Sequence, residues 1–186
     1  MKHLATTIVL SLLLAGCGSS DIAAECVTDY WDGTYGTCLP EGWTVMDKET
    51  LRQRGVPDET VTAFRSDLSV SGQFPSITVT REPLQQVVTA SDYSDASIRS
   101  VSVLPQYTLV DSTSVNIDDE NVKMHVFTGQ PVADEPARRF YQVSTVVGSD
   151  GFTVTASAPL FIDRELEKQI QLILEQSTFI GEVVEE

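Results

Sequence analysis

Apolar and polar residues alternate along several segments of this chain. From Phe152 to Ala158, apolar residues occupy every second position, and threonine or serine fills the positions between them. A period of two is typical of a β-strand with one buried face. With the preceding apolar segment, it predicts a hairpin of two strands, Arg139–Gly148 and Gly151–Ala158, joined through a Ser-Asp-Gly turn.

Four earlier segments are also predicted to be strands. Ser76–Glu82 alternates aliphatic residues with threonines, and Thr60–Asp67 precedes it. Tyr107–Ile117 and Val122–Thr128 are separated by a short acidic turn. Because the linking segments are short, we expect hairpin connections and an antiparallel sheet.

The strongest helical pattern lies near the C-terminus, in Asp163–Ser177. Asp163 is the expected N-cap, and two glutamates follow in the first turn. The aliphatic residues recur at the spacing of one helix face. They are Leu166, Ile170, Ile173 and Leu174.

Two further helices are predicted earlier in the chain. Ser91–Leu104 has Ser91 or Ser94 as its expected cap, and Asp47–Arg54 predicts a short helix that ends at a glycine. The apolar stripe of the longer helix is Ala96, Ile98, Val101 and Leu104. An antiparallel sheet must cover its apolar face. We therefore predict an α+β fold in which the sheet packs against two main helices.

The N-terminus has the pattern of an export signal. Lys2 precedes an apolar run, Leu4–Leu14, that is shorter than the roughly 20 residues of a membrane span. The sequence Leu14-Ala15-Gly16-Cys17 then resembles the lipobox of bacterial lipoproteins. The resemblance implies a diacylglyceryl group on the thiol of Cys17 and cleavage before it. The alternative is an ordinary cleaved signal that ends in Gly-Cys by chance.

These features divide the chain into a signal peptide (1–16), a lipidated tether (17–25), a disulfide-closed loop (26–38), an α+β domain (39–181) and an acidic tail (182–186). The lipid would hold the domain on the extracytoplasmic side of the bacterial envelope. Gly18 follows the cysteine where enterobacterial inner-membrane lipoproteins carry aspartate, which favours the outer membrane.

The chain is strongly acidic. Its 186 residues carry a formal net charge of −15, and removal of Lys2 with the signal peptide changes this to −16. A chain without a basic patch is a poor ligand for nucleic acid, and anionic headgroups repel it. We therefore expect membrane contact through the lipid on Cys17, and no nucleic-acid partner.

The two remaining cysteines, Cys26 and Cys38, are predicted to form a disulfide, since an even pair in an exported chain is typically bridged. A redox pair is the weaker alternative because there is no Cys-x-x-Cys motif. A zinc site is weaker still, because the nearest histidine in sequence beyond the signal segment is His125.

Aromatic and acidic residues are concentrated within and just after the Cys26–Cys38 segment. Aromatic rings beside carboxylates could form a sugar-binding platform, but rings that cover the edge of the core are the favoured interpretation. The candidate ligand-binding residues are Tyr30, Trp31, Tyr35 and Trp43.

No catalytic motif, phosphate loop, metal-ligand motif or cofactor fingerprint is found in the sequence. The alternation of Val122–Val126 places His125 opposite Met124, and we expect it to be exposed. The carboxylate pairs, Asp29 with Asp32 and Asp118 with Asp119, are expected by chance in a chain with 27 acidic residues. Asp118 and Asp119 also fit a hairpin turn better than a calcium site. We therefore expect a protein without enzymatic activity, metal or cofactor.

Several short motifs in this order resemble the DcrB-like branch of the PsbP-like superfamily. They are Pro40-Glu41-Gly42-Trp43, Ile77-Thr78-Val79-Thr80-Arg81-Glu82, Tyr107-Thr108-Leu109-Val110, Phe140-Tyr141-Gln142, Val154-Thr155-Ala156-Ser157-Ala158 and Ser177-Thr178-Phe179. The resemblance runs from about Leu39 to Ile180 and implies an α/β sandwich. Many bacterial members are small lipoproteins. PsbP assists photosystem II, and DcrB-like proteins are linked to the bacterial envelope and to phage uptake.

Three hypotheses for function follow. The favoured one is an envelope lipoprotein that binds or assists a protein partner. It is supported by the predicted lipid anchor, by the family resemblance and by the absence of a catalytic motif from the sequence. The alternative is a binder of small ligands or glycans that uses the aromatic loop near Trp31 and Trp43. The third is a glycan hydrolase, which would need two carboxylates about 5 to 10 Å apart across a groove.

Overall fold

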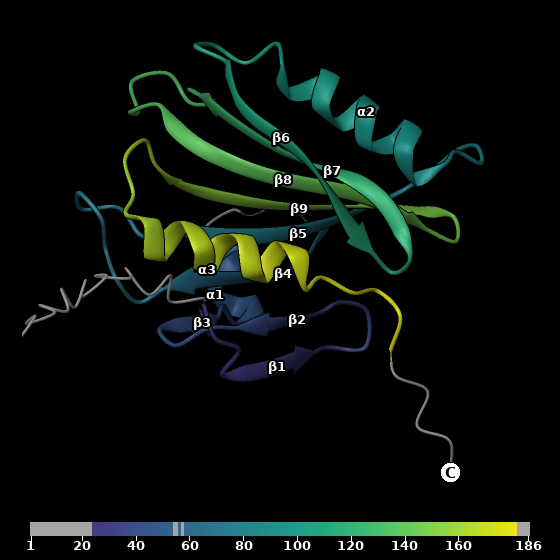
Figure 1. Ribbon diagram of the computed structural model, residues 1–186, viewed down its shortest axis with the longest axis horizontal. Helices are drawn as coiled ribbons and strands as arrows, with labels where there is room; N and C mark the ends of the chain where they lie inside the picture. Colours follow the sequence, from purple (N-terminus) through teal and green to yellow (C-terminus); the bar gives the residue numbers. More distant parts are fainter. Residues whose placement is uncertain (1–23, 54–55, 57, 182–186) are drawn as a thin grey trace, which may run out of the picture.

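The computed structural model describes residues 24–53, 56 and 58–181 (Figure 1). In chain order the elements are β1 (Thr28–Trp31), β2 (Gly36–Leu39), β3 (Trp43–Val45), α1 (Lys48–Gln53), β4 (Thr60–Ser66), β5 (Ser76–Pro83), α2 (Ala90–Val101), β6 (Thr108–Ile117), β7 (Glu120–Gly129), β8 (Arg138–Val147), β9 (Asp150–Pro159) and α3 (Arg164–Glu175). Seven strands form one antiparallel sheet in the order β3-β4-β5-β9-β8-β7-β6, and β1 pairs with β2 separately. The predicted α+β class is confirmed.

The alternation in β9 sets the two faces of the sheet. Phe152 and Val154 are buried in the main core, whereas Thr153 and Thr155 are partly exposed on the opposite face. The predicted hairpin forms between β8 and β9, with Val143 opposite Val154. The strands predicted earlier in the chain are also present, with ends within a few residues of those expected.

Helix α3 covers the core face of the sheet. Its N-cap is Asp163, as predicted, and the Asp163 carboxylate accepts a hydrogen bond from the Leu166 backbone N–H at 2.8 Å. The four aliphatic residues of the predicted stripe, Leu166, Ile170, Ile173 and Leu174, are all buried. They pack with residues of β4, β5, β8 and β9 into one cluster.

Helix α2 lies on the opposite face, over β7 and β8 (Figure 1). Its N-cap is Thr89 rather than Ser91 or Ser94, and the Thr89 hydroxyl accepts from the Asp92 N–H. The predicted apolar stripe is only partly buried, because Ile98, Val101 and Leu104 are half-buried and Ala96 is exposed. The fully buried side chains of the helix are those of Ala90, Tyr93 and Ser94. The serines of this helix made its orientation ambiguous in sequence, since a small polar side chain fits a buried or an exposed position.

The Cys26–Cys38 segment is a hairpin rather than a loop. Strands β1 and β2 pair from Thr28 to Leu39, and the predicted disulfide joins Cys26 to Cys38. The hairpin is part of the core, because the hydroxyl of Tyr35 lies 2.9 Å from Ser177 Oγ at the end of α3. The C-terminal segment pairs with β2 through two backbone hydrogen bonds between Gly36 and Thr178.

The predicted signal peptide, Cys17 and the acidic tail 182–186 lie outside the described residues. Within the described part of the chain, no helix is long and apolar enough to cross a membrane.

Candidate functional site

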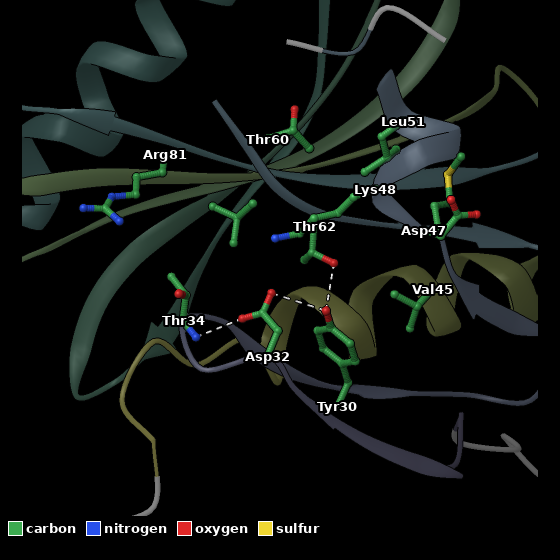
Figure 2. Close-up of a pocket in the computed structure, with 12 residues that line it drawn as sticks. Tyr30, Asp32, Thr34, Val45, Asp47, Lys48, Leu51, Thr60, Thr62 and Arg81 are labelled. Carbon is green, nitrogen blue, oxygen red and sulfur yellow. Dashed lines mark hydrogen bonds between the residues drawn. The ribbon is translucent and has the colours of Figure 1, made fainter. Parts of the chain in front are cut away.

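An open cleft of about 380 Å³ lies between the β1–β2 hairpin, the start of α1 and the β4–β5 strands (Figure 2). The polar residues that line it come from distant parts of the chain. They are Tyr30, Asp32, Thr34, Asp47, Lys48, Thr60, Thr62 and Arg81.

Tyr30 joins the hairpin to the wall of the cleft. Its hydroxyl lies 2.9 Å from Thr62 Oγ1 on β4 and also donates to the Asp32 carboxylate at 3.3 Å. Its ring packs edge-on against Phe64 in the core. Burial raises the pKa of Tyr30, and the Thr62 hydrogen bond opposes the shift. The phenol is therefore protonated at neutral pH and serves to hold the hairpin against the sheet.

Both carboxylates that line the cleft bind the backbone of their own segments. Asp32 accepts the N–H groups of Thr34 and Tyr35, each at 2.9 Å, and so fixes the hairpin turn. Asp47 accepts the N–H of Thr50 at 2.8 Å and its hydroxyl at 2.6 Å at the start of α1. Hydrogen bonds from Thr50 lower the pKa of Asp47. In Figure 2 the Asp47 carboxylate lies on the far side of the cleft from Asp32.

Two cations lie near the cleft. Arg81 is held by Asp150, with 2.8 Å between the guanidinium and the carboxylate. Lys48 is exposed and makes no hydrogen bond or ion pair within residues 24–53, 56 and 58–181. A free lysine beside hydroxyl groups can attract a small anionic group. Among the described lining residues, there is no carboxylate free of backbone contacts that could act as a general base.

A second open cleft, of about 550 Å³, lies on the other side of the hairpin and is lined by Trp31, Thr37, Gln176, Thr178 and neighbouring residues. Trp31 is 45% exposed. A Cβ added at Gly36 would come within 2.7 Å of the Trp31 ring, and one added at Gly181 within 2.9 Å. The indole therefore packs on its own chain and holds the C-terminal segment beside β2.

The four aromatic residues proposed as a ligand platform do not lie on one exposed surface, although Tyr30 and Trp31 both line the second cleft. Tyr35 is completely buried, and Trp43 is buried in the core with its indole N–H donating to Gln169 at 2.9 Å. Tyr30 and Trp31 each pack against the protein itself. The sequence could not show this, because it does not reveal that the hairpin folds onto β4 and α3.

The expectation that His125 is exposed is wrong. The residue is 3% exposed, because β7 is covered by α2 on the face opposite the main core. Its Nε2 lies 2.9 Å from the Tyr107 hydroxyl, and its ring packs against Phe127. Burial, with a smaller contribution from Lys123, lowers the pKa of His125. The neutral imidazole is part of a polar layer beneath α2 and lines neither cleft.

This polar layer continues along the sheet under α2. Ser144 Oγ and Thr153 Oγ1 lie 2.9 Å apart, and Gln142 donates to Thr155 at 3.2 Å. The Tyr93 hydroxyl donates to Glu82 at 2.8 Å. Burial raises the pKa of Tyr93 to about 12. These hydrogen bonds link the sheet to the underside of α2 through Tyr93, although the buried Oε1 of Gln142 has no partner among the described residues.

Asp118, Asp29 and the two neighbouring arginines of β8 also contact other residues of the chain. Asp118 lies in the predicted turn between β6 and β7, and its carboxylate accepts hydrogen bonds from Thr178 and Phe179. Asp29 lies close to both cysteines, but bridged sulfurs are not thiolate ligands for a metal. Arg138 and Arg139 form ion pairs with glutamates of the same chain.

The comparisons with known proteins identify similar folds but do not assign the chain to a family. No protein-family model matches the chain, and no curated protein matches it. Among solved structures, it is similar to the cyanobacterial PsbP (CyanoP) of Synechocystis sp. PCC 6803, with 16% identity and a TM-score of 0.56. That match covers 90% of this chain and 99% of the other.

Two bacterial structures are similar in the same way. LpqN of Mycobacterium tuberculosis, described as involved in cell envelope biogenesis, matches with 12% identity and a TM-score of 0.59 over 83% of this chain and 90% of LpqN. PA94 of Pseudomonas aeruginosa, a protein of unknown function and putative regulator, matches with 15% identity and a TM-score of 0.50 over 77% of this chain and 88% of PA94. The chain therefore has a PsbP-like fold.

Proposed function

We propose that this chain is a lipid-anchored protein of the bacterial envelope that acts without catalysis, as an accessory or binding factor for another envelope protein. The PsbP-like fold is the starting point. A fold alone carries no function, so the proposal depends on the site and on the sequence.

Export and anchoring are supported by the N-terminal sequence. The apolar run and Leu14-Ala15-Gly16-Cys17 supply the signal and the acceptor thiol. The Cys26–Cys38 disulfide is consistent with an oxidising compartment outside the cytoplasm. The likeness to LpqN, which is involved in cell envelope biogenesis, favours a role in the envelope.

A role without catalysis is supported by the state of the polar side chains. The carboxylates of the cleft bind backbone groups, and the imidazole of His125 is buried under α2. Catalysis by a general base needs a group that can reach the substrate proton. Asp32, Asp47 and the buried His125 are instead used to hold the fold.

The free edge of β6 is the observation that carries the protein-binding part of the proposal. This ten-residue strand pairs with β7 on one side and is an edge of the seven-stranded sheet on the other. Nearly all of its residues are exposed. An edge strand presents unpaired N–H and C=O groups, to which an extended segment of a partner can add as a further strand.

A photo-crosslinking amino acid in place of Ser114, on β6, tests this proposal in living cells. We expect a crosslinked species of one defined mass, containing an envelope protein. The same amino acid in place of Gln86, exposed in the loop before α2, is the matched control and should give none.

A second variant shows whether the edge itself is used. Ser112→Lys places a charge on the edge strand, which opposes strand addition, and should reduce the crosslink from position 114. Equal crosslinking from positions 86 and 114, or a crosslink unaffected by Ser112→Lys, would count against the proposal. So would capture from detergent-solubilised envelope that recovers no specific partner.

A further inference from the structure

One end of the seven-stranded sheet carries a set of exposed apolar side chains. The loops after β4, β7 and β9 and the loop into β6 all reach this end, because the strands are antiparallel (left in Figure 1). We call these residues the apolar rim: Leu68, Phe74, Val103, Val132, Leu160 and Phe161.

Three residues of the rim are largely exposed. Phe161 is 86% exposed, Val103 82% and Leu68 71%. From β4 to β6 the sheet spans about 24 Å at the usual spacing between strands. Single exposed apolar residues are normal in proteins, but several on adjacent loops at one end mark a contact surface.

The N-terminal end of the described chain lies at this same end of the sheet. The Val27 N–H donates to the Leu39 carbonyl at 3.1 Å, just before the turn into β3. That turn is itself held to the loop after β4, because the Asp67 N–H donates to the Gly42 carbonyl at 2.7 Å. The first described residues therefore lie beside the rim.

The length of the tether limits the distance between the rim and a bilayer. Six residues separate Cys17 from Ala24. A chain of this length reaches at most about 25 Å when fully extended. A lipid on Cys17 would therefore hold this end of the sheet close to the membrane surface, whereas the β6–β7 and β8–β9 turns lie at the opposite end (Figure 1).

We infer that the apolar rim inserts into the interfacial layer of the bilayer and orients the domain with its strands pointing away from the membrane. The inference rests on the proposed anchoring at Cys17. Apolar side chains at this depth gain the free energy of leaving water, and a short apolar contact adds to a lipid anchor.

The acidic residues beside the rim determine which lipid headgroups the rim can approach. Asp67, Asp134 and Asp163 lie in the same loops, and the whole chain is acidic. Anionic headgroups repel them, so the surface that fits is one of zwitterionic phospholipid. In this orientation the edge of β6 stays open to a partner from the side.

Depth-dependent quenching on the acylated full-length protein tests the orientation. A fluorescent NBD group is attached to Phe161→Cys in the rim, or to Val87→Cys as a matched control. Val87 is fully exposed in the loop before α2, at the opposite end of the sheet. The new cysteine is the single free thiol, since Cys26 and Cys38 are bridged and Cys17 is acylated. The proteins are placed in phosphatidylcholine vesicles that contain doxyl-labelled lipid.

We expect quenching at position 161 to exceed that at position 87 at least threefold, and to decrease when phosphatidylglycerol is added. Equally weak quenching at both positions, in protein that floats with the vesicles, would contradict insertion of the rim without contradicting the lipid anchor. A label at 161 that is shielded from aqueous iodide but not quenched by doxyl lipid would indicate a protein contact and also overturn it. Protein that does not float with the vesicles would contradict both the lipid anchor and the insertion of the rim.

Discussion

The carboxylate of Asp118, in the turn between β6 and β7, accepts the backbone N–H of Phe179 at 2.7 Å. It also accepts the hydroxyl of Thr178 at 2.6 Å. One turn residue thus fixes the segment that follows α3. Phe179, placed by these bonds, packs its ring against Phe152 and Tyr35 in the core.

Asp118→Ala should therefore lower the free energy of unfolding by about 1 to 3 kcal/mol, because it leaves the Phe179 N–H without its acceptor. Asp119→Ala is the matched control. Both residues have positive φ, 50° and 67°, so both variants strain the turn, but Asp119 makes no side-chain hydrogen bond with the described residues. Urea denaturation of both variants measures the difference, and equal losses would show that the carboxylate contacts contribute nothing.

The disulfide should contribute substantially to stability. Cys26 and Cys38 are 12 residues apart and hold a hairpin that supplies Tyr35 to the core. A loop of this length is worth about 3 kcal/mol in the chain-entropy model. We expect reductant to lower the urea midpoint of the wild type and to leave that of a Cys26→Ser, Cys38→Ser variant unchanged. A wild-type midpoint that does not respond to complete reduction would contradict this.

The packing of α2 depends on a glycine in β9. A Cβ at Gly151 would lie within 2.6 Å of Tyr93 Cε2. Gly151→Ala should therefore destabilise the protein by about 1 to 3 kcal/mol through overpacking. In a Tyr93→Ala background the same change should cost much less, because the ring is gone. A double-mutant cycle measures this coupling, and additive effects would refute the contact.

The stability should fall in mildly acidic solution because of His125. Burial lowers the pKa of this histidine below its ordinary value of 6.5, so the unfolded chain binds a proton before the folded one as the pH falls. The contribution of the neutral imidazole is complete above about pH 6.5 and is lost as the pH falls through the lowered pKa.

His125→Gln removes this titration and keeps a polar side chain beside Tyr107. The dependence of unfolding free energy on pH between 7.5 and 5.5 should become shallower in the variant. All other titratable groups are common to both proteins. Identical slopes for wild type and variant would show that His125 does not titrate differently in the folded state.

The elements with regular patterns were predictable from the sequence. Strand β9 and helix α3 each bury one face, so the period of their apolar residues is sufficient to define them. His125 was not predictable, because its burial depends on β7 being an inner strand covered on both faces. Strand order is a long-range property that local alternation does not carry.

The cleft illustrates the same limit. Tyr30, Lys48 and Thr62 line one cavity, yet they come from a hairpin, a helix and a strand with no shared motif. Tyr35 and Trp43 were candidates for a ligand platform, and the structure buries them because the hairpin packs against the core. The apolar rim also emerges only once the sheet brings its loops together.

We expect the chain to be held in the envelope by a lipid on Cys17. Mass spectrometry of the N-terminal peptide, with flotation of wild type and Cys17→Ser from the same cells, tests it most directly. We predict an acylated Cys17 at the N-terminus, wild type in the membrane fraction and the variant released from it. An unmodified Cys17, or a Cys17→Ser protein that floats as well as the wild type, would show that a lipid on Cys17 does not anchor the chain.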